Sequence, residues 1–191
     1  MVPVNCIELM VEEHKNIKRM LAVIRKYCYK VLKEDDVDYQ DFYKIIDFVR
    51  NYADKHHHGK EETLLFEMMM EELGTVAEKL VKFGMNIEHD MGRLHMQELE
   101  AAVQRVQNGD DESRLDIIAN AISYTHLLHR HIDKEDNVAF VYAEKNLTPA
   151  TLKRLDEECK KLEEEATNNK TIQKYLTLLE ELEKKTGTTG N

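Results

Sequence analysis

Histidine and glutamate crowd one short stretch of this chain, HHHGKEETLLF at residues 56–66. Imidazole nitrogens and carboxylate oxygens are both metal ligands, and side chains four residues apart share one face of a helix. The stretch therefore predicts either a metal site or a solvated cluster of charged side chains. Which of the two forms depends on which histidine and which glutamate face the protein interior.

The apolar pattern around the stretch indicates which side chains face inward. At helical spacing, His57 and Glu61 share a face with the apolar stripe of the segment. His58 instead lines up with polar residues, namely Asp47, Asn51 and Asp54. We therefore predict His57 and Glu61 as the inward pair, and we expect His58 and Glu62 on the solvent side.

The same residue types recur later in the chain. Residues 57–66, HHGKEETLLF, align with residues 131–140, HIDKEDNVAF, and the Glu-His dipeptide at 13–14 aligns with that at 88–89. The identities cluster on ionisable residues, which a repeat kept only for core packing would not need. The sequence predicts two copies of a helix pair, each with a histidine on its first helix and H-x-x-x-E on its second.

Four histidines and two glutamates are thereby predicted to point into the interior. They are His14, His57, Glu61, His89, His131 and Glu135. Burying these groups without compensation would be costly. The set suits two metal ions, each with two histidines, bridged by the two glutamates and completed by a water or hydroxide. Mixed imidazole and carboxylate ligands suit iron or manganese, and zinc is also compatible.

Each motif on its own has an ordinary explanation. A single buried histidine is commonly a hydrogen-bonded core residue, and an isolated H-x-x-x-E is commonly a surface ion pair. Their joint recurrence at matched offsets favours a metal site. Tyr124 lies two turns before His131 on the same face, either as a hydrogen-bond donor near the metals or as a core tyrosine. His56 and His129 are candidates for orienting the ligands.

Composition and capping signals predict the helices that position these residues. The chain has only 2 prolines and 7 glycines, which favours an all-α fold. Asn5 and Thr148 are expected N-caps. The expected helices run from Asn5 to a stop at 33–38, then over about 39–70, 76–107, 112–145, 149–166 and 170–185. Short connections predict an antiparallel up-down four-helix bundle with two additional C-terminal helices, which pack on the bundle or on a partner.

Charge and composition also limit where the protein is expected to reside and what it is expected to bind. The predicted domains are a bundle at 1–147, a helical extension at 148–185 and a disordered tail at 186–191. The net charge of −10 disfavours nucleic acid and anionic membrane as partners. No apolar run reaches a membrane span, no signal peptide is recognised, and three dispersed cysteines are typical of reduced thiols, so we expect a cytoplasmic protein.

Taken together, the motifs resemble the hemerythrin-like family over residues 5–145. They are EEH at 12–14, HHGKEETLLF at 57–66, EHDMGR at 88–93 and HIDKED at 131–136. The resemblance implies a four-helix bundle around two iron ions (Fe2+/Fe3+) joined by an oxo or hydroxo bridge. The ligands that it implies are His14, His57, Glu61, His89, His131 and Glu135.

Two positions depart from the oxygen carriers of that family. Those proteins have a further histidine where this chain has Met85, and their last carboxylate is an aspartate at the position of Asp136. Glu135 is preferred here because it matches Glu61 in the repeat, and the choice stays open. With one histidine fewer, the resemblance favours binding, sensing or reduction of O2, peroxide or nitric oxide over simple oxygen carriage. A redox partner protein is a further expectation, and the amphipathic C-terminal helices allow for an oligomer.

Two alternative functions remain at this point. One is a helical sensor or interaction module in which the metal only stabilises the fold. The other is iron storage or delivery, related to iron–sulfur repair, because four histidines with two glutamates are also similar to the di-iron repair proteins. Whether the chain is an enzyme is left open.

Overall fold

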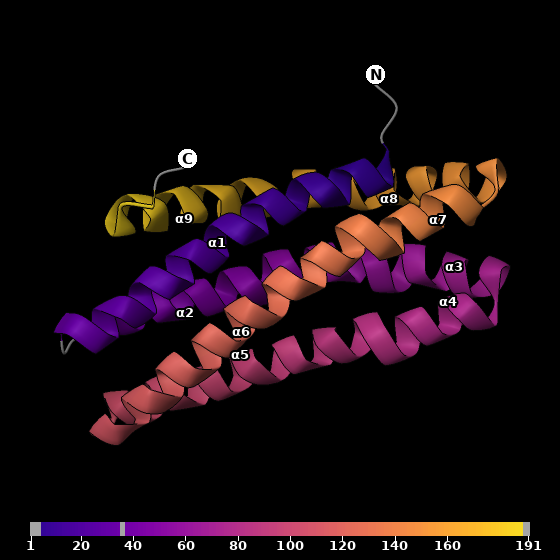
Figure 1. Cartoon of the computed structure of the whole chain (residues 1–191). Coiled ribbons are helices and arrows are strands. Elements are labelled where there is room, and N and C mark those ends of the chain that lie inside the picture. Colours follow the sequence, from indigo (N-terminus) through magenta and orange to yellow (C-terminus); the bar gives the residue numbers. More distant parts are fainter. Residues whose placement is uncertain (1–4, 35–36, 189–191) are drawn as a thin grey trace.

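A computed structural model describes residues 5–34 and 37–188, and within these ranges every regular element is a helix. Figure 1 shows long helices that run alongside one another, and each successive long helix reverses the direction of the one before. The all-α fold class expected from the composition is confirmed. A search of the described helices finds no segment that is long and apolar enough to cross a membrane.

The first two long helices follow the predicted ranges closely. The first is α1 (Cys6–Glu34). The second is continuous and changes its hydrogen-bonding pattern along its length, through α2 (Tyr39–Phe48), the π-helical segments η1 (Val49–His58) and η2 (Glu61–Leu65), and α3 (Phe66–Leu73).

The next two long helices also contain π-helical turns. The third comprises α4 (Thr75–Leu80), the π-helical η3 (Val81–Met85) and α5 (Asn86–Gln107). The fourth opens with a 3-10 turn, η4 (Asp111–Ser113), and continues as α6 (Arg114–Lys134), the π-helical η5 (Glu135–Ala139) and α7 (Phe140–Asn146). The two C-terminal helices are α8 (Pro149–Asn168) and α9 (Thr171–Thr186).

Two of the predicted helix caps are confirmed. The Asn5 Oδ1 atom accepts the Glu8 backbone N–H at 3.1 Å at the start of α1. The Thr148 hydroxyl oxygen accepts the Thr151 N–H at 3.3 Å, with Pro149 in the first turn of α8. A side-chain acceptor satisfies one of the backbone donors that every helix leaves free at its N-terminus.

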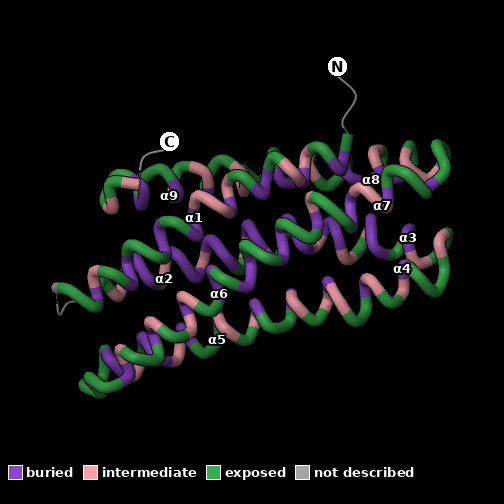
Figure 2. Tube along the Cα trace, in the orientation of Figure 1, coloured by how far each residue is buried: buried purple, intermediate pink, exposed green. Residues whose placement is uncertain are grey.

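A buried polar layer divides the interior into two apolar clusters. One cluster includes Ile17, Ala53 and Leu128, and the other includes Met10 and Leu65. Buried residues follow the inward faces of the helices along the length of the bundle (Figure 2). On α1, His14 lies between Met10 of one cluster and Ile17 of the other, so the polar layer interrupts the apolar stripe of this helix there.

The C-terminal helices belong to the same core and pack on the bundle. Figure 1 shows α8 and α9 lying along α1. Tyr175, Leu179 and Leu182 of α9 join the first apolar cluster, and Leu155 and Cys159 of α8 join the second. The extension therefore completes both clusters.

The end of the chain differs in part from the expected disordered tail. Thr186 is the last residue of α9, Gly187 takes a φ of 65°, and the Thr188 N–H donates to the Glu183 carbonyl at 3.1 Å. This is a helix C-cap, in which glycine supplies the left-handed residue. Residues 189–191 of the expected tail lie outside the described residues.

Shortening a core residue of α9 tests the packing of the extension. Leu179 is 0% exposed, whereas Leu162 of α8 is 37% exposed. We expect Leu179→Ala to lower the free energy of unfolding by about 2–5 kcal/mol, because it leaves a cavity in the first cluster. Leu162→Ala is the matched control and should cost less than about 1 kcal/mol. Urea denaturation measures both, and equal losses would contradict the shared core.

A buried carboxylate also ties α9 to the bundle. Asp41, which is 1% exposed, accepts the Tyr27 O–H at 2.5 Å and the Lys185 ammonium at 2.8 Å on both oxygens. Burial opposes ionisation of Asp41, but the hydrogen bonds from Lys185 and Tyr27 outweigh it and hold its pKa below the usual value. A carboxylate with a lowered pKa stabilises the fold above its unfolded pKa, and that stability is lost as the pH falls.

Asp41→Asn should therefore destabilise the protein at pH 7, and the difference from the wild type should shrink as the pH falls below about 4. Denaturation at a series of pH values measures this. Asp133→Asn, at a side chain that is 72% exposed, is the control and should change stability little throughout. A wild-type advantage that grows on acidification would refute the assignment.

Candidate metal centre

The six predicted ligands lie together in the buried polar layer. Each is at most 1% exposed. They come from all four long helices: His14 from α1, His57 from η1, Glu61 from η2, His89 from α5, His131 from α6 and Glu135 from η5. The structure thus brings the predicted residues into one place, and their role as ligands stays a prediction.

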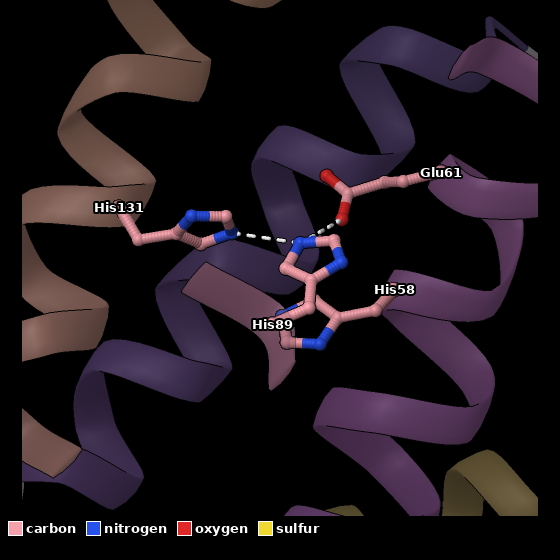
Figure 3. A group of neighbouring side chains, drawn as sticks. All are labelled: His58, Glu61, His89 and His131. Carbon is pink, nitrogen blue, oxygen red and sulfur yellow. Dashed lines mark hydrogen bonds and ion pairs between the residues drawn. The ribbon is translucent and has the colours of Figure 1, made fainter. Parts of the chain in front are cut away.

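The layer contains two adjoining groups of possible ligands. Within each group, one nitrogen or oxygen atom per residue lies within 4.8 Å of the others. One group is His14, His57, Glu61 and Glu135, and the other is His58, Glu61, His89 and His131. In the second group His131 faces the ring of His89, and Glu61 points toward the same space (Figure 3). Because both groups contain Glu61, they are neighbours.

Both H-x-x-x-E pairs meet as the helical spacing predicts. His57 Nε2 lies 3.6 Å from Glu61 Oε1, and His131 Nε2 lies 3.0 Å from Glu135 Oε1. Across helices, His14 Nε2 lies 3.3 Å from Glu135 Oε2. Glu135 is the carboxylate that faces the interior, whereas the side chain of Asp136 is 22% exposed. This placement agrees with the preference for Glu135 over Asp136.

An outer ring of carboxylates orients the imidazoles. In each case the histidine Nδ1 faces a carboxylate oxygen outside the layer. The pairs are His14 with Asp136 at 2.6 Å, His57 with Glu13 at 2.8 Å, His89 with Glu62 at 2.6 Å, and His131 with Glu88 at 3.0 Å. A neutral imidazole that donates from Nδ1 carries its lone pair on Nε2. The four outer carboxylates therefore turn four Nε2 atoms toward the interior.

The four carboxylates of the outer ring occupy matching positions in the two copies of the internal repeat. Glu13 aligns with Glu88, and Glu62 aligns with Asp136. The expectation that Glu62 belongs to the solvent side is therefore only half right. Its side chain is 28% exposed, but one oxygen binds His89. The alignment of Glu62 with Asp136 was the signal that could have identified this role.

Several inner atoms of the layer have no hydrogen-bond partner among the described residues. His14 Nε2, His57 Nε2 and both oxygens of Glu61 and Glu135 are buried and make no hydrogen bond. His89 Nε2 and His131 Nε2 lie 2.9 Å apart, and when both imidazoles are neutral and donate from Nδ1 their lone pairs face each other. Such an arrangement is costly unless a cation lies among these atoms. The donor set therefore fits metal ions.

His58 belongs to this layer, so its assignment to the solvent side is wrong. It is 4% exposed, its ring stacks on His89 with the centroids 3.9 Å apart, and its Nε2 is buried without a hydrogen bond. Its Nδ1 lies 3.4 Å from Asp54. One group therefore contains three histidines and the other two, in place of the expected two and two.

The π-helical turn explains why periodicity misplaced His58. Residues 49–58 form i→i+5 hydrogen bonds, which widen the turn and reduce the rotation per residue. Residues 57 and 58 then both face the interior. His58 aligns with Ile132 in the repeat, so it also breaks the symmetry of the two halves. An α-helical period cannot reveal this position.

The protein's own charges shift the pKa values of the layer. Burial, with the nearby charge of Glu135, raises the pKa of Glu61 well above its usual value. Burial lowers the pKa of His57 to about 4, so its imidazole is in the neutral, ligating form. For His131, burial is outweighed by Glu135 and Glu88, which raise its pKa to about 9. Protons and metal ions therefore compete for this layer.

A third group of possible ligands surrounds a lysine ammonium of the protein itself. Glu13, His56 and Glu163 approach one another at the edge of the layer. The Lys60 ammonium, 1% exposed, binds Glu13, lies 2.5 Å from Glu163 and lies 3.2 Å from His56. We therefore assign this group to Lys60. His56 contacts Glu13, the carboxylate that faces His57 Nδ1, so its role in orienting a ligand stays a prediction, whereas His129 is exposed and lies in none of the groups.

The role of His58 is tested by metal content. We expect His58→Ala to retain less metal than the wild type after loading and desalting, because it removes one of the three imidazoles of its group. His126→Ala is the matched control, since His126 is exposed. Elemental analysis per folded chain measures both variants. Full metal content and unchanged affinity in His58→Ala would show that His58 is not a ligand.

Comparison with protein families agrees with this geometry. The family model for the hemerythrin HHE cation binding domain matches residues 5–143, which is more than half of the chain and spans every residue of the two groups. Neither the comparison with curated proteins nor that with solved structures found a match. The expected resemblance is confirmed by the family match, and the chain belongs to the hemerythrin HHE cation-binding domain family.

Proposed function

We propose that this chain is a non-haem di-iron protein that binds, senses or reduces O2, peroxide or nitric oxide. One observation carries the proposal: buried imidazole nitrogens and carboxylate oxygens, most of them without a hydrogen-bond partner among the described residues, converge in two groups that share Glu61. Two adjoining groups with a common carboxylate suit two metal ions. Nitrogen and oxygen ligands together are typical of non-haem iron. Iron bound there would supply the one-electron and oxygen chemistry that side chains lack.

The residues around the layer prepare it for such ions. Glu13, Glu62, Glu88 and Asp136 fix the imidazole orientation from outside. Fixed rings reduce the ordering needed on binding. The apolar clusters on either side limit access of water along the bundle axis.

The two halves of the layer are chemically unequal. His58, His89 and His131 supply three imidazoles on one side, and His14 and His57 supply two on the other. We expect the side with three imidazoles to hold its ion more firmly and the side with two to exchange a ligand more readily. This inequality supports reactivity with a small molecule over a purely structural role for the metals.

Reaction with small molecules tests the proposal. Protein loaded with Fe2+ without air is mixed separately with O2, hydrogen peroxide and nitric oxide, and absorption and consumption of each are recorded. We expect at least one of them to be taken up in proportion to the iron, with a change in the visible spectrum. Zinc-loaded protein is the control and should take up none.

An iron-loaded protein that leaves all three molecules unconsumed and its spectrum unchanged would refute the proposal. Iron that passes at once to a mild chelator would instead support storage or delivery. Adding the chelator in a parallel sample separates these outcomes, because a di-iron centre buried in the bundle should exchange slowly.

A further inference from the structure

A cavity of about 260 Å3 adjoins the three-histidine side of the layer. His58 and His89 line it together with Tyr124, and the apolar residues Val49, Gly92 and Met96 also line it. Figure 3 shows the two stacked histidines that border it. The cavity therefore offers a space beside the candidate metal centre.

Tyr124 brings an unused hydrogen-bond donor to this cavity. The residue is 2% exposed, and its hydroxyl oxygen is buried without a hydrogen-bond partner. A buried hydroxyl without a partner costs free energy, so an ordinary core position would favour phenylalanine. Burial also raises the pKa of Tyr124, so the hydroxyl keeps its proton. Tyr124 lines the cavity, and its O–H has no acceptor among the described residues.

The size of the cavity exceeds the need of a diatomic ligand. A cavity of about 150 Å3 is enough to bind benzene in an engineered protein. At about 260 Å3 this cavity has room for a ring-sized apolar body and a polar group beside it. Its apolar wall favours such a body over water or hydrogen peroxide alone.

Three charged residues also line the cavity, Arg50, Asp54 and Arg93, and each is paired with an opposite charge. Arg50 contacts Glu100 at 2.6 Å, and Arg93 contacts both Asp54 and Glu62 at 2.7 Å. Each guanidinium is thus already beside at least one carboxylate that offsets its charge. The site therefore suits an uncharged ligand more than a carboxylate or a phosphate.

We propose that this cavity binds uncharged organic molecules that have an apolar body about the size of a benzene ring and one oxygen acceptor. The Tyr124 O–H donates to that oxygen and holds it beside His58 and His89. This proposal rests on the proposed function, because the bound organic molecule would lie beside the three-histidine side of the di-iron centre. Binding itself requires no redox chemistry.

Ligand titration of the zinc-loaded full chain, followed by NMR, tests the binding. The probes are benzyl alcohol, which has an oxygen acceptor, and toluene, which has none. We expect both to bind the wild type. Tyr124→Phe should weaken benzyl alcohol about three- to tenfold, the range of one net hydrogen bond, and should leave toluene unchanged or tighter. Benzoate should bind more weakly than benzyl alcohol.

Two substitutions at Gly92 locate the probes. A Cβ at this position would lie 3.5 Å from Tyr124 Cε2 and 3.6 Å from Leu128 Cδ2, which are ordinary contacts. Gly92→Ala should therefore retain binding, and Gly92→Leu should abolish it for both probes by filling the cavity. Helix content and zinc content of each variant establish that it is folded.

Failure of benzyl alcohol to bind the folded wild type, or an equal effect of Tyr124→Phe on both probes, would overturn the proposal. The outcome is separate from that of the iron experiment. Tyr124-dependent binding in a protein that is inert to O2, peroxide and nitric oxide would leave the cavity site standing and refute the proposed function.

Discussion

The structure depends on one constraint, which is the cost of burying imidazoles and carboxylates in the middle of an apolar bundle. Glu61 and Glu135 are 0% exposed, and their oxygens make no hydrogen bond among the described residues. Buried charges are tolerated only when they are compensated. Metal ions can provide that compensation at the centre. The protein provides the rest through the carboxylates that hold Nδ1 of each predicted histidine ligand.

The C-terminal extension is connected to this centre by a chain of charges. Glu163 of α8 contacts Lys60, Lys60 contacts Glu13, and Glu13 accepts the Nδ1–H of His57. The repeat places Lys134 and Glu88 in the corresponding positions beside His131, but that ammonium is half exposed. One copy of the repeat is thus covered by α8 and the other is open. The extension packs its apolar side chains in the bundle core and so contributes to the fold. This packing does not favour the alternative in which the C-terminal helices serve as a docking module.

Much of the fold and part of the site follow from the sequence, because helical periodicity reports faithfully on α-helical segments. It predicted the six helices within a few residues and brought His14, His57, Glu61, His89, His131 and Glu135 to one layer. It failed at His58, where a π-helical turn changes the rotation per residue. It also gave no account of Lys60, whose burial depends on Glu163, a residue distant in sequence.

The central claim is that the layer holds two metal ions, with His58 among the ligands of one. A crystal structure of the iron-loaded protein, with anomalous scattering recorded at the iron edge, tests it most directly. The account predicts two anomalous peaks in each chain, one beside His58, His89 and His131 and one beside His14 and His57. A single peak, no peak in fully loaded protein, or a His58 ring turned away from the metal would contradict it.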